Sequence, residues 1–373
     1  MNIQSFLSYI HSPKSDLGRK CVRGFLYFIS LFFRLGVSIK NALFDNCYYL
    51  GRGFRYKFIK VNIYNFKARI ISIGNIVAGG TGKTPLTILI AKEILKRKKK
   101  LAILSRGYKA KMQKDTFGPQ LVCSGKGPIK NAKECGDEPY LISKSVPKAF
   151  FFIGKNRVES SRMAIKEGAK VIILDDGMQY RKLHRDFEIV IMDGADPFGK
   201  GYFLPRGFLR DHPKSLERAD LIVINHIKNE KRMRAFERHL KKWSKAPVVG
   251  ANPVYLNTYS LDDKETFQLK GLKIAAFCGI AKPHHFYSLL RNEGANVILT
   301  MELADHEKID EKILEEYSIE AFERGAELVV CTEKDAVKLN PNLKIKLPFA
   351  YVKMELQITF GQALFQEALS EMV

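Results

Sequence analysis

The sequence lacks the cysteine and histidine patterns of disulfide-rich or zinc-binding proteins. Its six cysteines are scattered through 373 residues, with no C-x-x-C pair and no histidine at metal-ligand spacing. A disulfide framework is not expected in a chain of this length, so the cysteine content indicates a reducing compartment. No cysteine stands in a pattern that gives it a catalytic role. The six are Cys21, Cys47, Cys123, Cys135, Cys278 and Cys331.

The sequence also has no uncharged run that is long enough to span a bilayer. The run at residues 24–33 lies between Arg23 and Arg34 and is shorter than the ~20 residues that a spanning helix needs. No small-residue cleavage site follows it, so a secretory signal peptide is not expected. Apart from Ser30, residues 25–33 are apolar or aromatic, which favours a helix lying in or dipping into an anionic membrane surface. The alternative is an ordinary buried helix of the first domain.

Acidic residues are few relative to basic ones. There are 62 Lys and Arg against 39 Asp and Glu, for a formal net charge of +23. Such an excess of positive charge raises the local concentration of anions. The candidate anionic ligands are nucleic acid, lipid headgroups and a phosphorylated substrate. The basic clusters at residues 96–100, 206–214 and 231–245 are spread along the chain. No basic motif is interleaved with aromatic residues, which counts against nucleic-acid binding.

From residue 68 onward the pattern alternates between strand and helix, without an internal repeat. The strand candidates are largely continuous apolar runs, as a parallel sheet covered on both faces requires. The first series is residues 69–73, 101–104, 149–153, 171–174, 188–192 and 221–224. The second is residues 273–278, 296–300, 327–331 and 349–352, with a helix at 283–293. The segment 248–259 lacks helical periodicity and is expected to be a linker.

The strongest motif is the strand at 69–73, the sequence A-G-G-T-G-K-T and a helix over 83–97. Glycines let consecutive N–H groups point inward around phosphate oxygens, and the helix N-terminus adds its positive end. Lys83 is expected to reach the β- and γ-phosphates, and the Thr84 hydroxyl to bind Mg²⁺. Val77 replaces the first glycine of the general P-loop pattern, and the alternative is a chance glycine-rich turn. The nucleotide-binding residues are Ala78, Gly79, Gly80, Thr81, Gly82, Lys83 and Thr84.

A P-loop needs a metal-binding carboxylate at the end of a neighbouring strand. Asp175 and Asp176 follow the apolar run at 171–174, where α/β sheets bind ligands. The alternative is that Asp-Asp-Gly forms only a turn.

Asp137 and Glu138 precede Pro139 at a tight turn or helix start. The residues support two roles for Asp137 equally well: the N-cap of a helix and a catalytic residue.

Three further segments have both a chemical and a structural interpretation. The basic loop at 203–211, which includes Arg210, would steady a phosphoryl group or bind an anionic substrate, or is a solvated basic face. Asp305 and His306 follow the strand at 296–300, and the histidine has a structural role or helps to deprotonate a hydroxyl. The T-E-K-D sequence at 332–335 partly matches a guanine-reading motif but lacks its asparagine, so GTP is a minor option.

In order and spacing, these blocks resemble the tetraacyldisaccharide 4'-kinase family of lipid A and lipopolysaccharide biosynthesis. The resemblance runs from about residue 69 to residue 339 and extends the P-loop block to Pro85. The matching blocks are G-N at 74–75, A-G-G-T-G-K-T-P at 78–85, S-R-G-Y at 105–108, G-D-E-P at 136–139, D-D-G-M-Q at 175–179, F-G at 198–199, L-P at 204–205, A-D-H at 304–306 and T-E-K-D-A-V-K at 332–338.

The resemblance implies an enzyme that transfers the γ-phosphate of ATP, with Mg²⁺, to the 4'-hydroxyl of an acylated diglucosamine 1-phosphate. It implies work at an anionic membrane surface, the cytoplasmic face of the inner membrane of a Gram-negative-type cell. The glycolipid is then the partner, with no nucleic acid and no obligate protein partner. The implied fold is a P-loop NTPase-like parallel sheet domain plus a smaller α/β domain, with the active site in the cleft between them. The predicted divisions are a membrane-associated segment at 1–60, a kinase domain at 61–258 and a C-terminal α/β domain at 259–373.

The resemblance also implies roles for residues whose local patterns leave alternatives open. Asp137 paired with His306 becomes the candidate base for the sugar hydroxyl, and Arg210 a phosphate or substrate contact. Lys83 and Asp176 complete the implied catalytic set. The implied metal-site residues are Thr84, Asp175, Asp176 and Glu138, with Gln179 nearby.

The loop around Arg210 departs from the family pattern. The family usually reads L-P-A-G-P-L-R-E, whereas this chain has Arg206, Phe208 and Asp211 at three of those positions. The added positive charge suits a differently acylated or more anionic substrate. The alternative function is a membrane-recruited P-loop ATPase or GTPase switch, which would hydrolyse nucleotide without a sugar acceptor.

Overall fold

The computed structural model describes residues 16–49, 54–56, 59–107, 110–112, 118–280, 283–303, 310–340 and 345–373. Contacts group the chain into two compact units, each assembled from separate stretches of sequence. Unit 1 comprises Met1–Lys83, Lys170–Ala251 and Ile358–Val373, and unit 2 comprises Thr84–Ala169 and Asn252–Gln357. Because the units are defined by contacts and not by continuous sequence, they do not test the domain boundaries expected from the sequence, which stay a prediction.

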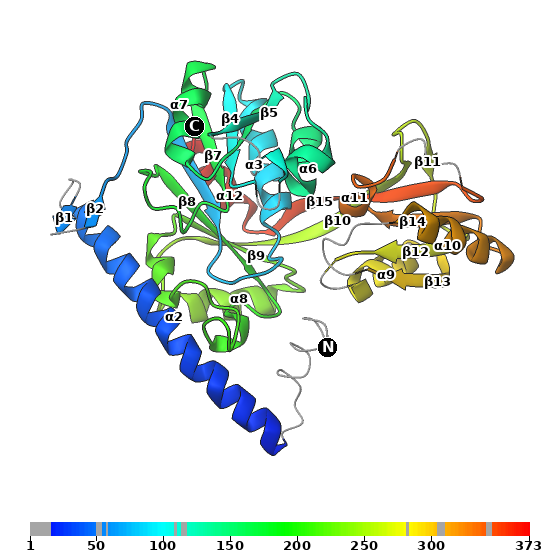
Figure 1. Ribbon diagram of the computed structural model, residues 1–373, viewed down its shortest axis with the longest axis horizontal. Coiled ribbons are helices and arrows are strands. Elements are labelled where there is room, and N and C mark those ends of the chain that lie inside the picture. The colour runs from blue at the N-terminus through cyan, green and yellow to red at the C-terminus, as the bar shows by residue number, and fades with distance from the viewer. Residues whose placement is uncertain are drawn as a thin grey trace. The chain divides into compact units, whose positions relative to one another are not determined.

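Unit 1 is built on a parallel sheet whose neighbouring strands run in the order β10-β9-β8-β3-β7. All residues of β7, β8 and β9 are buried, as the continuous apolar runs in the sequence predict for strands covered on both faces. The elements of the unit are α2 (Leu17–Tyr49), β1 (Phe54–Tyr56), β2 (Ile59–Val61), β3 (Arg69–Gly74), β7 (Val171–Asp175), β8 (Phe187–Asp193), the 3-10 helices η1 (Gly199–Gly201) and η2 (Pro213–Arg218), β9 (Leu221–Asn225), α8 (Glu230–Leu240) and α12 (Gln362–Glu371) (Figure 1).

The carboxyl ends of β3, β7 and β9 position the residues of the candidate site. The P-loop follows β3, the Asp-Asp-Gly turn follows β7, and Asn225 is the last residue of β9. One face of this sheet packs on α8 through Met233 and Leu240, which join a core cluster with Val190 and Ile222. The strands are therefore rigid supports for the loops at this edge.

Unit 2 contains the helix that follows the P-loop and the second α/β series. Strand β6 pairs with β4 in parallel and with β5 in antiparallel orientation. Further along the chain, β13, β12, β14 and β15 form parallel neighbours in that order. Three elements begin or end in unit 1, namely α3 at Lys83, β10 over its first four residues and β15 over its last three. The elements that lie wholly or mostly in unit 2 are α3 (Lys83–Lys96), β4 (Leu101–Ser105), β5 (Gln120–Ser124), α5 (Ala132–Cys135), α6 (Asp137–Ser145), β6 (Phe150–Ile153), α7 (Arg157–Lys166), β10 (Val248–Ser260), β11 (Thr266–Phe267), β12 (Lys273–Cys278), α9 (Pro283–Asn292), β13 (Asn296–Glu302), α10 (Glu311–Glu323), β14 (Leu328–Thr332), α11 (Glu333–Ala336) and β15 (Phe349–Phe360).

Helices cover both faces of the sheet formed by β12 to β15. Phe286 and Leu290 of α9 pack with Ile274 in one cluster of buried side chains. Leu314 and Tyr317 of α10 pack with other residues of the same strands in a second cluster. This arrangement confirms the predicted covered parallel sheet in the second series.

The predicted linker at 248–259 is wrong, because these residues form the 13-residue strand β10. Val248 to Ala251 pair in parallel with β9, and the strand then continues to pair with β11 in antiparallel orientation. Its interior contains Gly250, Asn252 and Pro253, which disfavour strands by intrinsic propensity. Pairing with neighbouring strands outweighs that propensity here.

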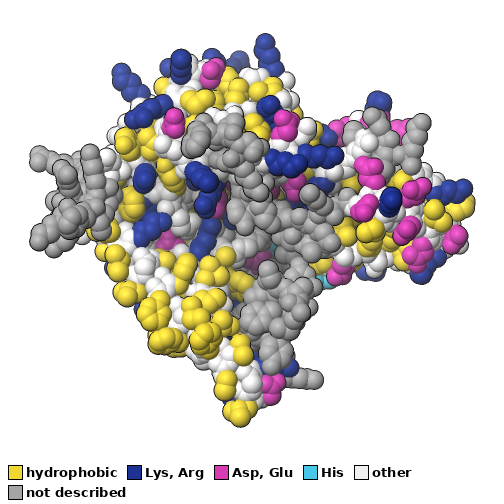
Figure 2. All heavy atoms as spheres, viewed as in Figure 1, with side chains coloured by type: hydrophobic (Ala, Val, Ile, Leu, Met, Phe, Trp, Pro, Cys, Tyr) yellow, Lys and Arg dark blue, Asp and Glu magenta, His cyan; other side chains and the backbone are white. Residues whose placement is uncertain are grey.

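Helix α2 is far longer than the apolar run that identified it. It covers 33 residues, and Leu17–Asn46 is by length and composition apolar enough to cross a membrane, a property that signal sequences share. Its large apolar side chains are mostly exposed, and Figure 2 shows hydrophobic side chains gathered where α2 lies in Figure 1. The alternative of an ordinary buried helix is therefore wrong.

Candidate functional site

The P-loop has the open, inward-curled backbone that its glycines predict. Gly79 and Gly82 adopt φ values of 109° and 99°, a region that side chains strongly disfavour. Lys83 and Thr84 are the first two residues of α3, so the helix N-terminus directly follows the loop. This is the geometry of a phosphate-binding loop.

Two asparagines at strand ends fix the shape of the loop through Thr81. The amide of Asn75 donates to the Thr81 hydroxyl at 2.8 Å, and the amide of Asn225 donates to the Thr81 carbonyl at 3.1 Å. All three side chains are buried. Sequence reasoning gave neither asparagine a role, although the position of Asn225 at the carboxyl end of a buried strand was a usable signal.

The segment before Arg210 supports the opposite side of the P-loop by backbone hydrogen bonds. The Ala78 N–H donates to the Phe208 carbonyl at 2.7 Å, and the Arg210 N–H donates to the Ile76 carbonyl at 2.9 Å. Val77 forms a β-bridge with Leu209 between these contacts. The valine that replaces the expected glycine is therefore a packed and paired residue.

Asp176 brings the acidic turn together with two cations. Its carboxylate lies 3.7 Å from the Lys83 ammonium and accepts hydrogen bonds from the Arg210 guanidinium, one of them at 3.0 Å. Asp176 has φ 52°, a conformation that aspartate tolerates better than most residues. The next residue, Gly177, has no room for a side chain, because a Cβ there would lie 2.4 Å from the Ser72 hydroxyl. The structure thus brings together Lys83, Asp176 and Arg210 of the predicted catalytic set.

Arg210 also binds Asn75, so one guanidinium contacts the ends of two strands. Its Nη2 donates to the Asn75 side-chain oxygen, and its Nε donates to the Asn75 carbonyl at 3.3 Å. A planar guanidinium with several N–H donors suits such a forked contact. Lys83 and Arg210 thus place two cations beside the P-loop, where they can contact nucleotide phosphates.

The residues near the P-loop fit a magnesium ion that is bound together with substrate phosphates. Asp175 is buried at the end of β7 and Thr84 lies in the first turn of α3. Among the described residues, no three His, Cys, Asp or Glu side chains form a ready-made metal cluster. Mg²⁺ commonly binds through one or two carboxylates plus phosphate oxygens, so this donor set suits it better than zinc.

Asp211, next to Arg210, is a buried carboxylate that stays charged. Burial on its own raises the pKa of Asp211, but the Arg218 guanidinium and hydrogen bonds from Asn41, Ser215 and the backbone N–H of His212 outweigh it. The pKa of Asp211 is therefore held below its usual value. The sequence identified this position only as a departure from the family pattern.

In unit 2, Asp137 and Glu138 are the first two residues of α6. The N-cap is Gly136, with φ 95°, and no side chain caps the helix. The N-cap interpretation of Asp137 is therefore wrong, while the predicted helix start is confirmed, with Pro139 in the first turn. Burial raises the pKa of the neighbouring Cys135 to about 12, so this thiol stays protonated at neutral pH.

The T-E-K-D segment has a structural role in unit 2. Asp335 is fully buried, accepts a hydrogen bond from the Gly279 N–H at 2.9 Å and pairs with Lys338 at 2.8 Å. The Thr332 hydroxyl also binds this carboxylate. These contacts occupy the aspartate that a guanine-reading motif would need. Asp305, His306 and Tyr108 lie outside the described residues.

The departures in the Arg210 loop have partial explanations. The Arg206 guanidinium lies over the Tyr202 ring, 4.5 Å from its centroid, and Phe208 packs against the core cluster of unit 1. Nothing in the structure links either side chain to a substrate.

Gly82 is the loop position where a side chain is expected to do most harm. In Gly82→Ala the new Cβ would lie 2.4 Å from the Asn225 amide nitrogen, and the residue would keep a φ that costs roughly 1–2 kcal/mol. We expect the Kd for a fluorescent ATP analogue to rise about tenfold or more, since tenfold corresponds to about 1.4 kcal/mol. Gly24→Ala in α2 is the matched control, because a Cβ at that position would have no other atom within 4 Å and the residue lies outside the nucleotide-binding loop. Equal affinities of the two variants would contradict this account.

Comparisons with known proteins agree with this geometry. The sequence profile of the family described as "Tetraacyldisaccharide-1-P 4'-kinase" matches residues 24–373. The tetraacyldisaccharide 4'-kinase of Syntrophus aciditrophicus is 35% identical over 357 residues, covering 92% of this chain and 91% of the relative. That of Chlamydia abortus is 37% identical over 320 residues, covering 82% of each chain.

A solved structure supports the fold independently of sequence. The crystal structure of LpxK from Aquifex aeolicus in complex with ATP matches with a TM-score of 0.73 at 24% identity, covering 94% of this chain and 99% of that one. This confirms the predicted class, a P-loop NTPase-like sheet with a second α/β part. The chain belongs to the tetraacyldisaccharide-1-P 4'-kinase family.

Proposed function

We propose that this protein is an ATP-dependent kinase that phosphorylates the 4'-hydroxyl of a tetraacyl-type diglucosamine 1-phosphate in lipid A biosynthesis. The observation that carries the proposal is the convergence of Lys83, Asp176 and Arg210 on the P-loop, in a chain of this family. A switch ATPase or GTPase would share the P-loop, but family membership favours the kinase.

The roles of the P-loop residues follow from their chemistry. Residues 78–85 bind the nucleotide phosphates, with Lys83 and Arg210 offsetting charge on the γ-phosphoryl oxygens. Thr84 and Asp175 are the proposed ligands of Mg²⁺, with Asp176 and Glu138 as further candidates. When bound, the ion neutralises phosphate charge and orients the transferring group.

The acceptor hydroxyl needs a base, and we assign that role to Asp137 with assistance from His306. A carboxylate in the first turn of α6 is held in place by the helix and is well suited to receive the proton. The transfer is in-line, and the protein positions and neutralises without a covalent intermediate.

The experiment that tests this function is transfer of labelled γ-phosphate from ATP to a detergent-dispersed acylated disaccharide 1-phosphate. We expect transfer by the wild-type protein, and loss of about 10²–10⁴-fold in kcat for Asp137→Asn with nucleotide binding retained. Glu159→Gln, a carboxylate in the first turn of α7, is the matched control and should keep wild-type turnover. Hydrolysis of ATP without transfer to the glycolipid would refute the kinase assignment. A near-normal kcat for Asp137→Asn would refute the role of that residue.

The acyl chains of the substrate place the enzyme at a membrane, and α2 is the proposed attachment. Its exposed aromatic residues Phe28 and Phe32 lie on one helix face, with ring centroids 5.1 Å apart. Flanking basic residues suit an anionic leaflet, which supports the cytoplasmic face of the inner membrane as the location.

Replacing both phenylalanines tests this attachment. Full burial of a phenylalanine stabilises by roughly 1.5–3 kcal/mol, so the double variant Phe28→Ser and Phe32→Ser should bind anionic phospholipid vesicles at least about tenfold more weakly. Sedimentation with vesicles measures this. The control variant changes Ile313 and Ile319, exposed apolar residues of α10, to serine. If both variants sediment like the wild type, α2 is not the attachment.

A further inference from the structure

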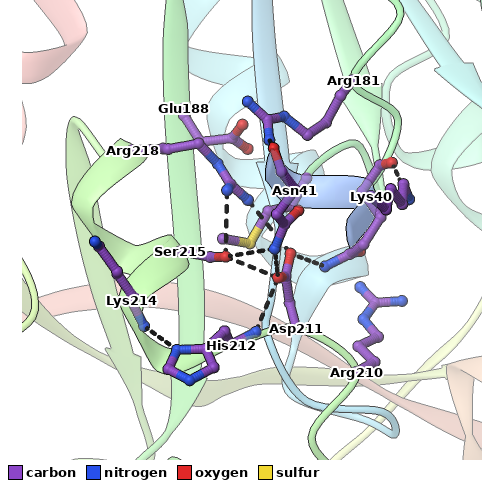
Figure 3. A network of polar contacts seen from close by, with 12 residues as sticks. Lys40, Asn41, Arg181, Glu188, Arg210, Asp211, His212, Lys214, Ser215 and Arg218 are labelled. Atoms are coloured by element: carbon purple, nitrogen blue, oxygen red, sulfur yellow. Dashed lines mark hydrogen bonds and ion pairs between the residues drawn. The ribbon is translucent and has the colours of Figure 1, made fainter. Parts of the chain in front are cut away.

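Helix α2 makes specific polar contacts with the candidate site in addition to exposing apolar side chains. Two consecutive residues near its carboxyl end are responsible. The Lys40 ammonium donates to the Gln179 carbonyl at 3.0 Å, and the Asn41 amide donates to the Asp211 carboxylate at 2.8 Å. Figure 3 shows the Asn41 side chain pointing at the Asp211 carboxylate.

The Asp211 carboxylate is the centre of this network. It is 2% exposed and accepts from the Ser215 hydroxyl at 2.7 Å and from Arg218 at 3.3 Å, in addition to Asn41. The Gln179 amide spans the distance to the P-loop, donating to the Asn75 carbonyl at 2.9 Å and to Asp211 at 3.4 Å. A buried carboxylate with several donors has little freedom to move.

Asp211 shares its backbone anchor with Arg210. The N–H groups of both residues donate to the Ile76 carbonyl, at 2.9 Å from Arg210 and 3.2 Å from Asp211. A shift of the Asp211 side chain would therefore move the backbone that carries the Arg210 guanidinium. That guanidinium binds Asp176 and Asn75 at the P-loop.

A second set of contacts holds this part of α2 in register. The Arg181 guanidinium pairs with Asp45 at 2.6 Å, donates to the Asn41 carbonyl at 3.2 Å and lies over the Phe44 ring. Because Arg181 contacts both Asn41 and residues further along the helix, it limits rotation of the helix. A helix that served only for attachment would not need contacts that converge on one carboxylate.

We propose that Asn41 is a positioning residue for phosphoryl transfer, which acts through Asp211 to place Arg210. The packing of α2 against the rest of unit 1 and the orientation of the Arg210 guanidinium are then coupled. The enzyme is fully active only when the helix is in place. This inference rests on the proposed kinase function.

The first test is the variant Asn41→Ala in the labelled-phosphate assay. We expect kcat to fall about tenfold or more, with KM for ATP within about twofold of wild type, because the P-loop itself is unchanged. Ser38→Ala is the matched control on the same helix, since Ser38 is exposed and bonds only to the Arg34 carbonyl of α2 in the described network. An unchanged kcat for Asn41→Ala overturns the proposal.

A donor–acceptor exchange separates positioning from general stability. Asn41→Asp and Asp211→Asn should each lower kcat, and the double variant N41D/D211N restores one donor facing one acceptor at the same net charge. Because Asp211→Asn also removes the carboxylate that faces Arg218 and Ser215, we expect partial recovery, with a kcat for the double variant at least about threefold above that of Asn41→Asp alone. This comparison decides the matter even if Asn41→Ala unfolds. Additive losses overturn the proposal. If the wild type itself shows no transfer, the kinase function fails instead.

Discussion

The Arg210 guanidinium is the interaction on which the candidate site depends. It connects Asn75, which follows β3, with Asp176, which follows β7, and so ties together the ends of two neighbouring parallel strands. Lys83 adds a second cation beside Asp176. Two cations beside the P-loop suit the binding of nucleotide phosphates, and the buried strands beneath them support the loops that carry them.

The same arginine explains why an attachment helix has polar contacts. The apolar part of α2 is exposed, whereas Asn41 is directed into the Asp211 network one residue from Arg210. Membrane attachment and positioning of the phosphoryl-binding group thus belong to different parts of one helix. For an enzyme whose acceptor carries acyl chains, such coupling would restrict full activity to the surface where the substrate is found.

The sequence predicted the strands well because buried parallel strands are continuous apolar runs, as in β8. The sequence did not predict β10, because its glycine and proline have low strand propensity and the strand is stabilised by pairing with its neighbours. The P-loop and Asp176 were found from local motifs. Asn225 and Asp211 were not assigned roles, because their importance comes from partners such as Thr81 and Asn41 that lie far away in the chain.

The most direct measurement is the steady-state kinetics of Arg210→Lys in the phosphate-transfer assay. Lysine keeps the positive charge but lacks the planar fork that contacts Asn75 and Asp176 together. The account predicts a kcat at least about tenfold lower, with a KM for ATP close to that of the wild type. A wild-type kcat would show that charge alone suffices at this position, and would contradict the central role given to the guanidinium bridge.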